Sequence, residues 1–413
     1  MLFPPPNRPA TPHRVAVTGA GIVSALGVGW RANADGFRVG RRAFRPVTRF
    51  PVTAQRAKIA AEADLPERLP PSRLTPRQER RLDHATRLLL HATREAWERS
   101  GWQSPEAVPL VLGMTSGGMD DGQAYFLHAR QTPERRRGQP TRSLVYQAQT
   151  QGRWVAEALG LTGPIRVVSH ACASGADAIG QAWEYIRRGH SPRALAGGYD
   201  MLSRLVFAGF DSLQALSTTT CRPFDAERDG LALGEGAAVL ALEDWASARE
   251  RGADILGELI GFGAALDLHH VAQPDPEGDA TLAAMRAACA VADVTPAEVD
   301  YLNAHGTGTR LNDTAESRAI ARWAGDAAAR IPLSSTKAAV GHTLGAAGAI
   351  EAVVCLMTLR EGWLPPETGI GRVEPACPCP LVREPVVTHP RVALSNSIGF
   401  GGANATLIFR RAG

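Results

Sequence analysis

The sequence predicts an α/β protein made of two halves, each with its own largely parallel sheet. Short apolar runs typical of buried strands alternate along the chain with longer stretches typical of helices. The 413 residues exceed one ordinary domain and suit two of about 200 residues each. A glycine-led apolar run over residues 234–242 is followed by a charged segment, so we expect the halves to be residues 1–250 and 251–413.

The expected strands are short buried runs bounded by turn residues. The first covers residues 14–18 and is predicted to end in a glycine turn formed by Gly19, Ala20 and Gly21. The other strands are expected at residues 108–112, 165–168, 194–197, 234–242, 255–263, 299–303, 331–334, 392–395 and 405–409. Their alternation with helices favours parallel pairing within each half.

The clearest expected helix covers residues 80–100, and Gly101 follows it as a stop signal. Its apolar side chains recur at helical spacing, at Leu82, Ala85, Leu88, Leu89, Ala92, Ala96 and Trp97. The other helices are expected at residues 145–159, 174–188, 281–291, 313–323 and 344–359. Residues 134–140 are polar and arginine-rich, and we expect a loop there.

Composition and charge exclude several classes of protein. With Lys+Arg 45 against Asp+Glu 41, the formal net charge is +4, without the concentrated basic field of a nucleic-acid-binding protein. No run of 18 apolar residues occurs, and the proline-rich start lacks the apolar core of a signal peptide, so we expect neither a membrane span nor export. Six scattered cysteines suit a reducing compartment, and we expect the cytoplasm.

Two short features raise the question of a metal site. They are Cys377-Pro-Cys379 and the adjacent pair His269 and His270. Neither has a second pair at ligand spacing in the sequence, so we expect no metal site.

Four segments place polar residues among small neighbours where an expected strand meets the next element. They are residues 169–175, 303–309, 337–348 and 399–404. Active sites of open α/β sheets collect at the carboxyl ends of strands. We therefore expect the chemistry of the protein to reside in these segments.

Cys172 is the candidate nucleophile. It follows an expected strand and precedes an expected helix, so its sulfur would lie at a helix amino terminus, where the helix dipole favours a thiolate. A small buried structural cysteine is the alternative, and the position and neighbours of Cys172 favour the nucleophile.

Two histidines and a lysine complete the candidate set. His305 enters a Gly-Thr-Gly-Thr turn, whose N–H groups and hydroxyls can hold an elongated polar ligand. His342 lies five residues after Lys337. Lysine occurs only at positions 58 and 337, so 45 − 2 leaves 43 arginines, and a lysine kept at 337 indicates a need for a compact ammonium. Each histidine alone is compatible with a structural role, but one cysteine, two histidines and a rare lysine together indicate nucleophilic catalysis.

The four segments resemble those of the β-ketoacyl-acyl carrier protein synthases, specifically the elongating, decarboxylating synthase I and II group of the thiolase-like superfamily. The resemblance extends from about Arg14 to Phe409, nearly the whole chain. It includes three further family hallmarks, residues 222–225, 228–230 and 234–236. It implies a thiolase-like five-layer α-β-α-β-α fold from two similar halves, and a dimer.

The resemblance also implies roles for individual residues. Cys172 maps onto the nucleophile, His305 and His342 onto the paired histidines, and Lys337 onto their supporting lysine. Glu351 maps onto the buried acidic partner of that lysine. The residues implied to bind substrate are Gly399, the gate residue Phe400, Thr307 and Thr309 for the pantetheine arm, and Ser116 at the acyl pocket.

The implied reaction is a two-stage Claisen condensation that needs no metal or organic redox cofactor. Acyl carrier protein delivers an acyl group to Cys172, and malonyl carrier protein then loses CO2 and attacks the acyl-enzyme. The implied partners are acyl carrier protein and a second subunit, either another copy of this chain or a chain-length factor.

Several alternatives are weighed against this interpretation. A chain-length factor resembles a synthase but lacks the nucleophile, and Cys172 argues against it. A thiolase needs a second reactive cysteine in the carboxyl-terminal glycine motif, which has none in residues 399–402. The initiating synthases use Cys, His and Asn instead of a lysine-preceded second histidine. A dinucleotide-binding oxidoreductase is suggested only by Gly19 and Gly21, with serine at the third glycine position.

The sequence leaves the acyl substrate and the pathway open. Ser116 is small where many fatty-acid synthases of this type carry a branched aliphatic residue, which favours a longer or stiffer chain. Residues 311–313 are similar to those of polyketide or aryl-polyene synthases. The arginine run Arg135, Arg136 and Arg137 is a candidate docking surface for the acidic carrier protein, with Arg77, Arg80 and Arg81 as the alternative.

Overall fold

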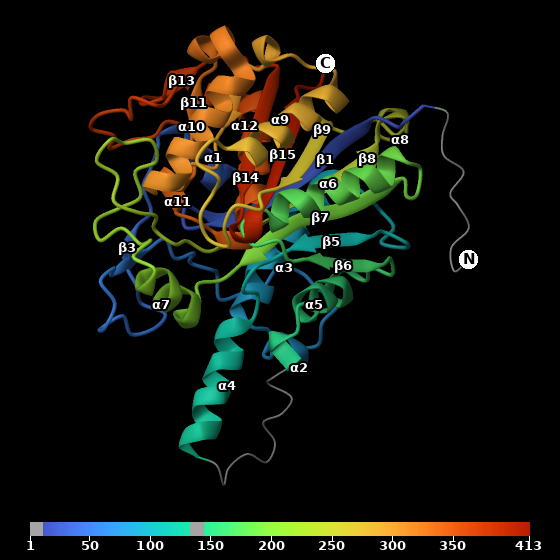
Figure 1. Ribbon diagram of the computed structural model, residues 1–413. Helices are drawn as coiled ribbons and strands as arrows, with labels where there is room; N and C mark the ends of the chain where they lie inside the picture. Colours follow the sequence, from blue (N-terminus) through green and yellow to red (C-terminus); the bar gives the residue numbers. More distant parts are fainter. Residues whose placement is uncertain (1–10, 133–143) are drawn as a thin grey trace.

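The computed structural model describes residues 11–132 and 144–413 as a mixed α/β protein (Figure 1). The main strands are β1 (Val15–Ser24), β5 (Leu110–Gly113), β6 (Ile165–Val168), β7 (Arg193–Asp200), β8 (Gly236–Asp244), β9 (Gly257–Leu266), β10 (Tyr301–Asn303), β11 (Leu333–Ser334), β14 (Val392–Ile398) and β15 (Ala403–Arg410). The short strands are β2 (Gly27–Val28), β3 (Arg45–Pro46), β4 (Ile59–Ala60), β12 (Trp363–Leu364) and β13 (Val386–Val387).

The helices alternate with these strands along the chain. They are α1 (Trp30–Arg38), α2 (Pro76–Glu79), α3 (His84–Ser100), α4 (Met119–Gln131), α5 (Thr150–Leu159), α6 (Ser174–Arg187), α7 (Arg204–Ser212), α8 (Trp245–Glu250), α9 (Asp279–Ala292), α10 (Arg310–Ala324), α11 (Lys337–Val340) and α12 (Ala347–Glu361). The helix expected over residues 80–100 begins at His84, because Asp83 caps its first turn by accepting the N–H of Thr86 at 2.8 Å. It ends at Gly101 as expected, in the left-handed conformation.

The main strands form one 11-stranded sheet in the order β11-β10-β14-β15-β9-β1-β8-β7-β5-β6, with β2 beside β1. The prediction of two separate, largely parallel sheets is therefore wrong in two respects. Residues Val15 to Val17 of β1 pair with Gly257 to Leu259 of β9 and join the two halves. Only β5 and β10 pair in parallel with both neighbours, while the central strands are antiparallel.

The elements pack as five layers of helix and sheet. Helices α3 and α5 cover one half of the sheet from outside, and α9 and α10 cover the other. Helices α6 and α12 lie between the two halves and contact strands of both. Every residue of α12 from Ala347 to Leu359 is buried, which fits an apolar helix covered on all sides.

Gly19 and Gly21 do not form the predicted turn. Both lie inside β1, which continues to Ser24 and pairs with β8 across them. A Cβ atom at Gly19 would lie 2.2 Å from the carbonyl oxygen of Ala96, and one at Gly21 would lie 2.0 Å from that of Ala92. The two glycines therefore let α3 approach the strand closely. The glycine turn on which the dinucleotide-binding alternative depends is part of a strand instead.

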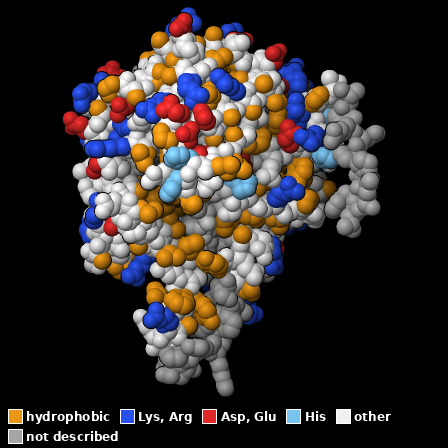
Figure 2. Space-filling view, in the orientation of Figure 1, with side chains coloured by type: hydrophobic (Ala, Val, Ile, Leu, Met, Phe, Trp, Pro, Cys, Tyr) orange, Lys and Arg blue, Asp and Glu red, His pale blue; other side chains and the backbone are white. Residues whose placement is uncertain are grey.

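Helix α4 projects from the body of the protein (Figure 1) and buries none of its residues. Its Phe126 is 58% exposed, and hydrophobic side chains gather on this projection in Figure 2. Elsewhere on that face, basic and acidic side chains are interspersed (Figure 2). The expected loop at residues 134–140, with Arg135, Arg136 and Arg137, lies outside the described residues. Within residues 11–132 and 144–413, no helix has the length and apolarity to cross a membrane.

Candidate active site

The carboxyl ends of strands from both halves converge on a pocket of about 340 Å3. Strand β6 leads to Cys172, β10 to His305, β11 to the segment with His342, and β14 to Gly399 and Phe400. Seven of the sequence-predicted site residues line this pocket, namely Cys172, His305, Thr307, Thr309, His342, Gly399 and Phe400. Residues more than 200 positions apart thus share one cavity.

Cys172 lies in the turn between β6 and α6. The preceding Ala171 has a φ of 48°, a conformation that non-glycine residues rarely adopt. The turn is held by Ser174, whose hydroxyl accepts the N–H of His170 at 2.8 Å and donates to the carbonyl of Ala171 at 2.6 Å. The fold keeps this strained turn in front of α6, which places Cys172 at the pocket wall with 5% exposure.

Burial opposes the thiolate that the helix start favours at Cys172. Burial raises the pKa of its thiol to about 12. The ammonium of Lys337 and the N–H of Phe400 lower this pKa but do not compensate for burial. The resting group is therefore a neutral thiol at neutral pH.

His305 is a neutral, oriented hydrogen-bond donor. Burial lowers its pKa well below the ordinary value of 6.5, and the charge of Lys337 lowers it further. Lys337 Nζ lies 3.2 Å from His305 Nδ1 and donates to the His305 carbonyl at 2.6 Å. Because an ammonium can only donate, Nδ1 is the acceptor and the ring proton is on Nε2.

His342 has the same protonation pattern from a different cause. The backbone N–H of Leu344 donates to His342 Nδ1 at 3.2 Å, so the ring proton again belongs on Nε2. Burial also lowers the pKa of His342 well below 6.5. The two rings lie edge to face, with centroids 5.2 Å apart. The pair can therefore present two N–H groups to one oxygen atom in the pocket.

Lys337 and Glu351 form a buried ion pair beneath the histidines. Lys337 is 1% exposed and Glu351 is fully buried in α12. Burial raises the pKa of Glu351, and the ammonium of Lys337 opposes this rise. The pair orients Lys337 toward the ring and carbonyl of His305.

Two buried carboxylates that the sequence analysis did not single out hold the loop after β10. Glu316 accepts the N–H groups of His305 and Gly306, both at 2.8 Å. Asp313 accepts those of Thr307 and Gly308 at 3.0 and 3.2 Å. Both acids lie on the buried face of α10, three residues apart, and this spacing of acidic residues within an expected helix is the sequence signal that could have identified them.

Ser116 does not line the described pocket. It is 4% exposed, and its hydroxyl donates to Asp200 at 2.9 Å. Asp200, at the end of β7, also accepts the N–H groups of Thr115, Ser116, Gly117 and Gly345. Asp200 therefore ties the turn after β5 to the segment that carries His342, a role that no local sequence pattern indicates.

Phe400 lines the same pocket as Cys172. It is 39% exposed and stacks on Phe210, with ring centroids 5.5 Å apart. Its backbone N–H lowers the pKa of the Cys172 thiol. At Gly399, a Cβ atom would lie 3.2 Å from the Cys172 nitrogen, so this position needs the smallest residue for close approach.

Known sequences and structures show what the chain is similar to. The profile of "Beta-ketoacyl synthase, N-terminal domain" matches residues 13–248, and that of "Beta-ketoacyl synthase, C-terminal domain" matches residues 256–370. The chain is 36% identical over 428 residues to "3-oxoacyl-[acyl-carrier-protein] synthase 2" of Rhizobium meliloti (strain 1021), covering 97% of this chain and 99% of the relative.

Two solved structures share the fold over nearly the whole chain. The ishigamide ketosynthase/chain length factor superposes with a TM-score of 0.90 at 31% identity, covering 98% of this chain and 100% of that chain. A type II polyketide synthase acyl-carrier protein in complex with its ketosynthase bound to the hexaketide superposes with a TM-score of 0.89 at 25% identity, covering 97% and 100%.

Proposed function

This chain belongs to the β-ketoacyl synthase family, and we propose that Cys172, His305, His342 and Lys337 carry out its condensation reaction. The protein is an acyltransferase that joins an acyl-enzyme thioester to malonyl-acyl carrier protein, giving 3-oxoacyl-acyl carrier protein and CO2. The observation that carries the assignment of residues is the pair of neutral histidines facing one pocket with Cys172. Both have Nδ1 occupied by a donor, which leaves Nε2–H for the substrate.

In the first stage, the sulfur of Cys172 attacks the thioester carbon of the acyl carrier protein arm. The new bond joins sulfur to the acyl carbon, and the bond to the pantetheine sulfur breaks. The proton of the Cys172 thiol leaves on the pantetheine thiol, so the exchange is balanced. The backbone N–H groups of Cys172 and Phe400 would stabilise the oxyanion, which fits the lowering of the Cys172 pKa by the N–H of Phe400.

In the second stage, malonyl carrier protein occupies the same pocket. Loss of CO2 leaves the bonding electrons on the thioester as an enolate, whose oxygen is negative. The Nε2–H groups of His305 and His342 would donate to this oxygen, and the enolate carbon would then attack the acyl carbon on Cys172. This attack forms the new carbon–carbon bond and breaks the bond from the acyl carbon to the sulfur, and the Cys172 thiolate that leaves takes a proton from water. The neutral state of both rings suits this role, because a donor is needed and no proton has to be removed.

Lys337 and the two threonines would support this chemistry without reacting. Lys337, held by Glu351, fixes the tautomer and the position of His305. Thr307 and Thr309 line the pocket, with their hydroxyl oxygens 2.9 Å apart, and would bind the pantetheine arm. Phe400 would act as the gate that moves when an acyl group enters.

Acyl carrier protein is a partner of this chain. It appears in the name of the Rhizobium relative and in that of the solved polyketide synthase complex. The second subunit is a copy of this chain or a chain-length factor, the partner of the ishigamide ketosynthase. A role for this chain as the chain-length factor itself is disfavoured, because Cys172 is present and lines the pocket.

The first half, residues 1–250, would supply the nucleophile, and the second, residues 251–413, the histidines, lysine and gate. All six cysteines are free, which suits the cytoplasm.

Products from a panel of acyl carrier proteins test this function. The purified protein is incubated with malonyl carrier protein and acyl carrier proteins of different chain length, and product masses are measured. We expect products extended by two carbons and bearing a 3-oxo group, and none from Cys172→Ala, which leaves only a small cavity. Elongation by folded Cys172→Ala would contradict the assignment, and the preferred acyl group would place the enzyme in fatty-acid or polyketide synthesis.

A further inference from the structure

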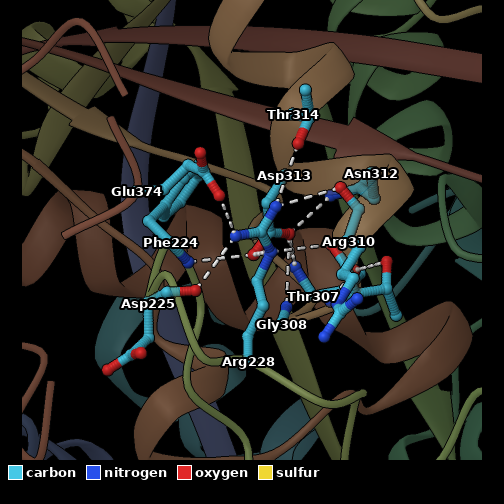
Figure 3. Close-up of polar contacts among 12 residues, drawn as sticks. Phe224, Asp225, Arg228, Thr307, Gly308, Arg310, Asn312, Asp313, Thr314 and Glu374 are labelled. Atoms are coloured by element: carbon cyan, nitrogen blue, oxygen red, sulfur yellow. Dashed lines mark hydrogen bonds and ion pairs between the residues drawn. The ribbon is translucent and has the colours of Figure 1, made fainter. Parts of the chain in front are cut away.

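Arg228 is a fully buried cation next to the loop that carries Thr307 and Thr309. It is 2% exposed, and its guanidinium forms ion pairs with Asp313 and Glu374, the first with a nitrogen to oxygen distance of 3.5 Å (Figure 3). Its N–H groups donate to the carbonyls of Asp225, Thr309 and Arg310 at 2.9, 3.2 and 3.0 Å, and to the hydroxyl of Thr314 at 2.9 Å. The guanidinium thus joins three segments of chain at one point.

Asp313 carries the effect of Arg228 to the loop. Its Oδ1 accepts the backbone N–H groups of Thr307 and Gly308 (Figure 3). Its Oδ2 accepts the N–H of Phe224 at 2.9 Å and is the atom that faces Arg228. Both oxygens therefore act as acceptors, a role that the carboxylate form fills best.

The charge of Arg228 maintains that form. Burial raises the pKa of Asp313, and Arg228 is the largest opposing influence. Without Arg228, Asp313 would be a buried carboxylate with no cation, and a protonated Asp313 would lose an acceptor oxygen. The backbone N–H groups of Thr307 and Gly308 would then lose their anchor.

The histidine next to this loop has a separate anchor. Glu316 holds the N–H groups of His305 and Gly306, and Lys337 holds the His305 ring. Two different carboxylates of α10 therefore hold the backbone of His305 and the backbone of Thr307 and Gly308. A change at Arg228 acts on the second of them.

We propose that Arg228 is a positioning residue for the pantetheine arm of the carrier protein, acting through Asp313 on the backbone of Thr307 and Gly308. The inference rests on the proposed function, because Thr307 and Thr309 are taken to bind that arm. Arg228 hydrogen-bonds two residues of the pocket lining, through the carbonyl groups of Thr309 and Arg310. Its loss should weaken arm binding more than it slows decarboxylation.

Steady-state kinetics of the Arg228→Gln variant test this division. We expect the KM for malonyl carrier protein to rise about tenfold, the scale of one lost hydrogen bond to a charged group, while kcat changes by less than about threefold. Asp313→Asn should raise KM similarly, and the double variant should raise it no further, because both act in one chain of contacts. Arg318→Gln, on the exposed side of the same helix, is the matched control and should leave KM unchanged. The proposal would be overturned if Arg228→Gln lowered kcat without raising KM. It would also be overturned if the effects of the two single variants on KM were additive in the double variant.

A second measurement does not depend on condensation. Pantetheine should protect Cys172 from alkylation by iodoacetamide, and the concentration for half protection should rise about tenfold in Arg228→Gln, with the unprotected rate unchanged. If wild-type protein makes no 3-oxoacyl product, the proposed function fails, while this protection still decides the role of Arg228. If Arg228→Gln does not fold, Arg228→Lys keeps the charge without the planar fork, and half protection should rise about threefold. Unchanged protection in either folded variant would overturn the proposal.

Discussion

Replacing Lys337 by methionine should separate stability from catalysis at the histidine pair. Lys337 and Glu351 are both almost fully buried, so the change leaves a carboxylate without its cation. Removing one partner of a buried pair typically costs about 3–5 kcal/mol in the free energy of unfolding. We expect about 3 kcal/mol here, because burial already raises the pKa of Glu351 and lets it accept a proton.

The same change removes the contact to His305 Nδ1 at 3.2 Å and frees the ring to adopt the other tautomer. Decarboxylation should then fall by about 100-fold, the scale for one preorganised oxyanion donor. Urea unfolding measures the stability, and release of CO2 from malonyl carrier protein measures the chemistry.

Two companion variants make the reasoning refutable. The double change Lys337→Met with Glu351→Gln should recover most of the lost stability without recovering decarboxylation, because no charge is left unpaired. Lys337→Arg should be nearly as inactive as Lys337→Ala, because a planar guanidinium does not fit a site built around a compact ammonium. Wild-type turnover in Lys337→Arg would refute the role assigned to the lysine.

Four further outcomes are expected. In nitrogen NMR of histidine-labelled protein, His305 and His342 should stay neutral with the proton on Nε2 as the pH falls through 6.5, and a titration there would contradict the assigned tautomers. Because these folded-state pKa values lie below the unfolded value of 6.5, the unfolded chain binds more protons in that range, and the free energy of unfolding should fall as the pH drops below 6.5. Phe400→Ala should alter the preference for acyl groups or the order in which they are loaded. An unchanged preference across a series of acyl chain lengths would contradict the role of Phe400 as a gate. Replacing Arg135, Arg136 and Arg137, which lie outside the described residues, by Glu should raise the KM for carrier protein at low salt and less at high salt, and an unchanged KM would move docking to Arg77, Arg80 and Arg81.

The sequence located the candidate reactive side chains, three of which line one pocket, because cysteine, histidine and lysine next to expected strand ends are visible locally. It could not show Asp200 as an organiser, since Asp200 accepts backbone N–H groups of Ser116 and Gly345 that only the fold brings close. Gly19 and Gly21 carry the same local signal for a turn and for close packing, and the contact with α3 decided between them. No single segment of sequence indicates the direction of its neighbouring strands, so the sequence analysis did not predict the antiparallel pairing at the centre of the sheet.

Cys172 shows the same limit in its electrostatics. The helix start that favours a thiolate can be read from the sequence, whereas the burial that raises the pKa of the thiol to about 12 is a property of the assembled pocket. Ser116 could be placed in a turn, but the direction of its hydroxyl toward Asp200 required the structure.

The central claim is that the histidine pair performs decarboxylation independently of the nucleophile. The most direct test is CO2 release from malonyl carrier protein by Cys172→Gln, alone and combined with His342→Ala. The single variant should release CO2 at or above the wild-type rate without making elongated product, and the added loss of His342 should suppress release by about 100-fold. A folded Cys172→Gln protein that releases no CO2, or a double variant that keeps the full rate, would contradict the account.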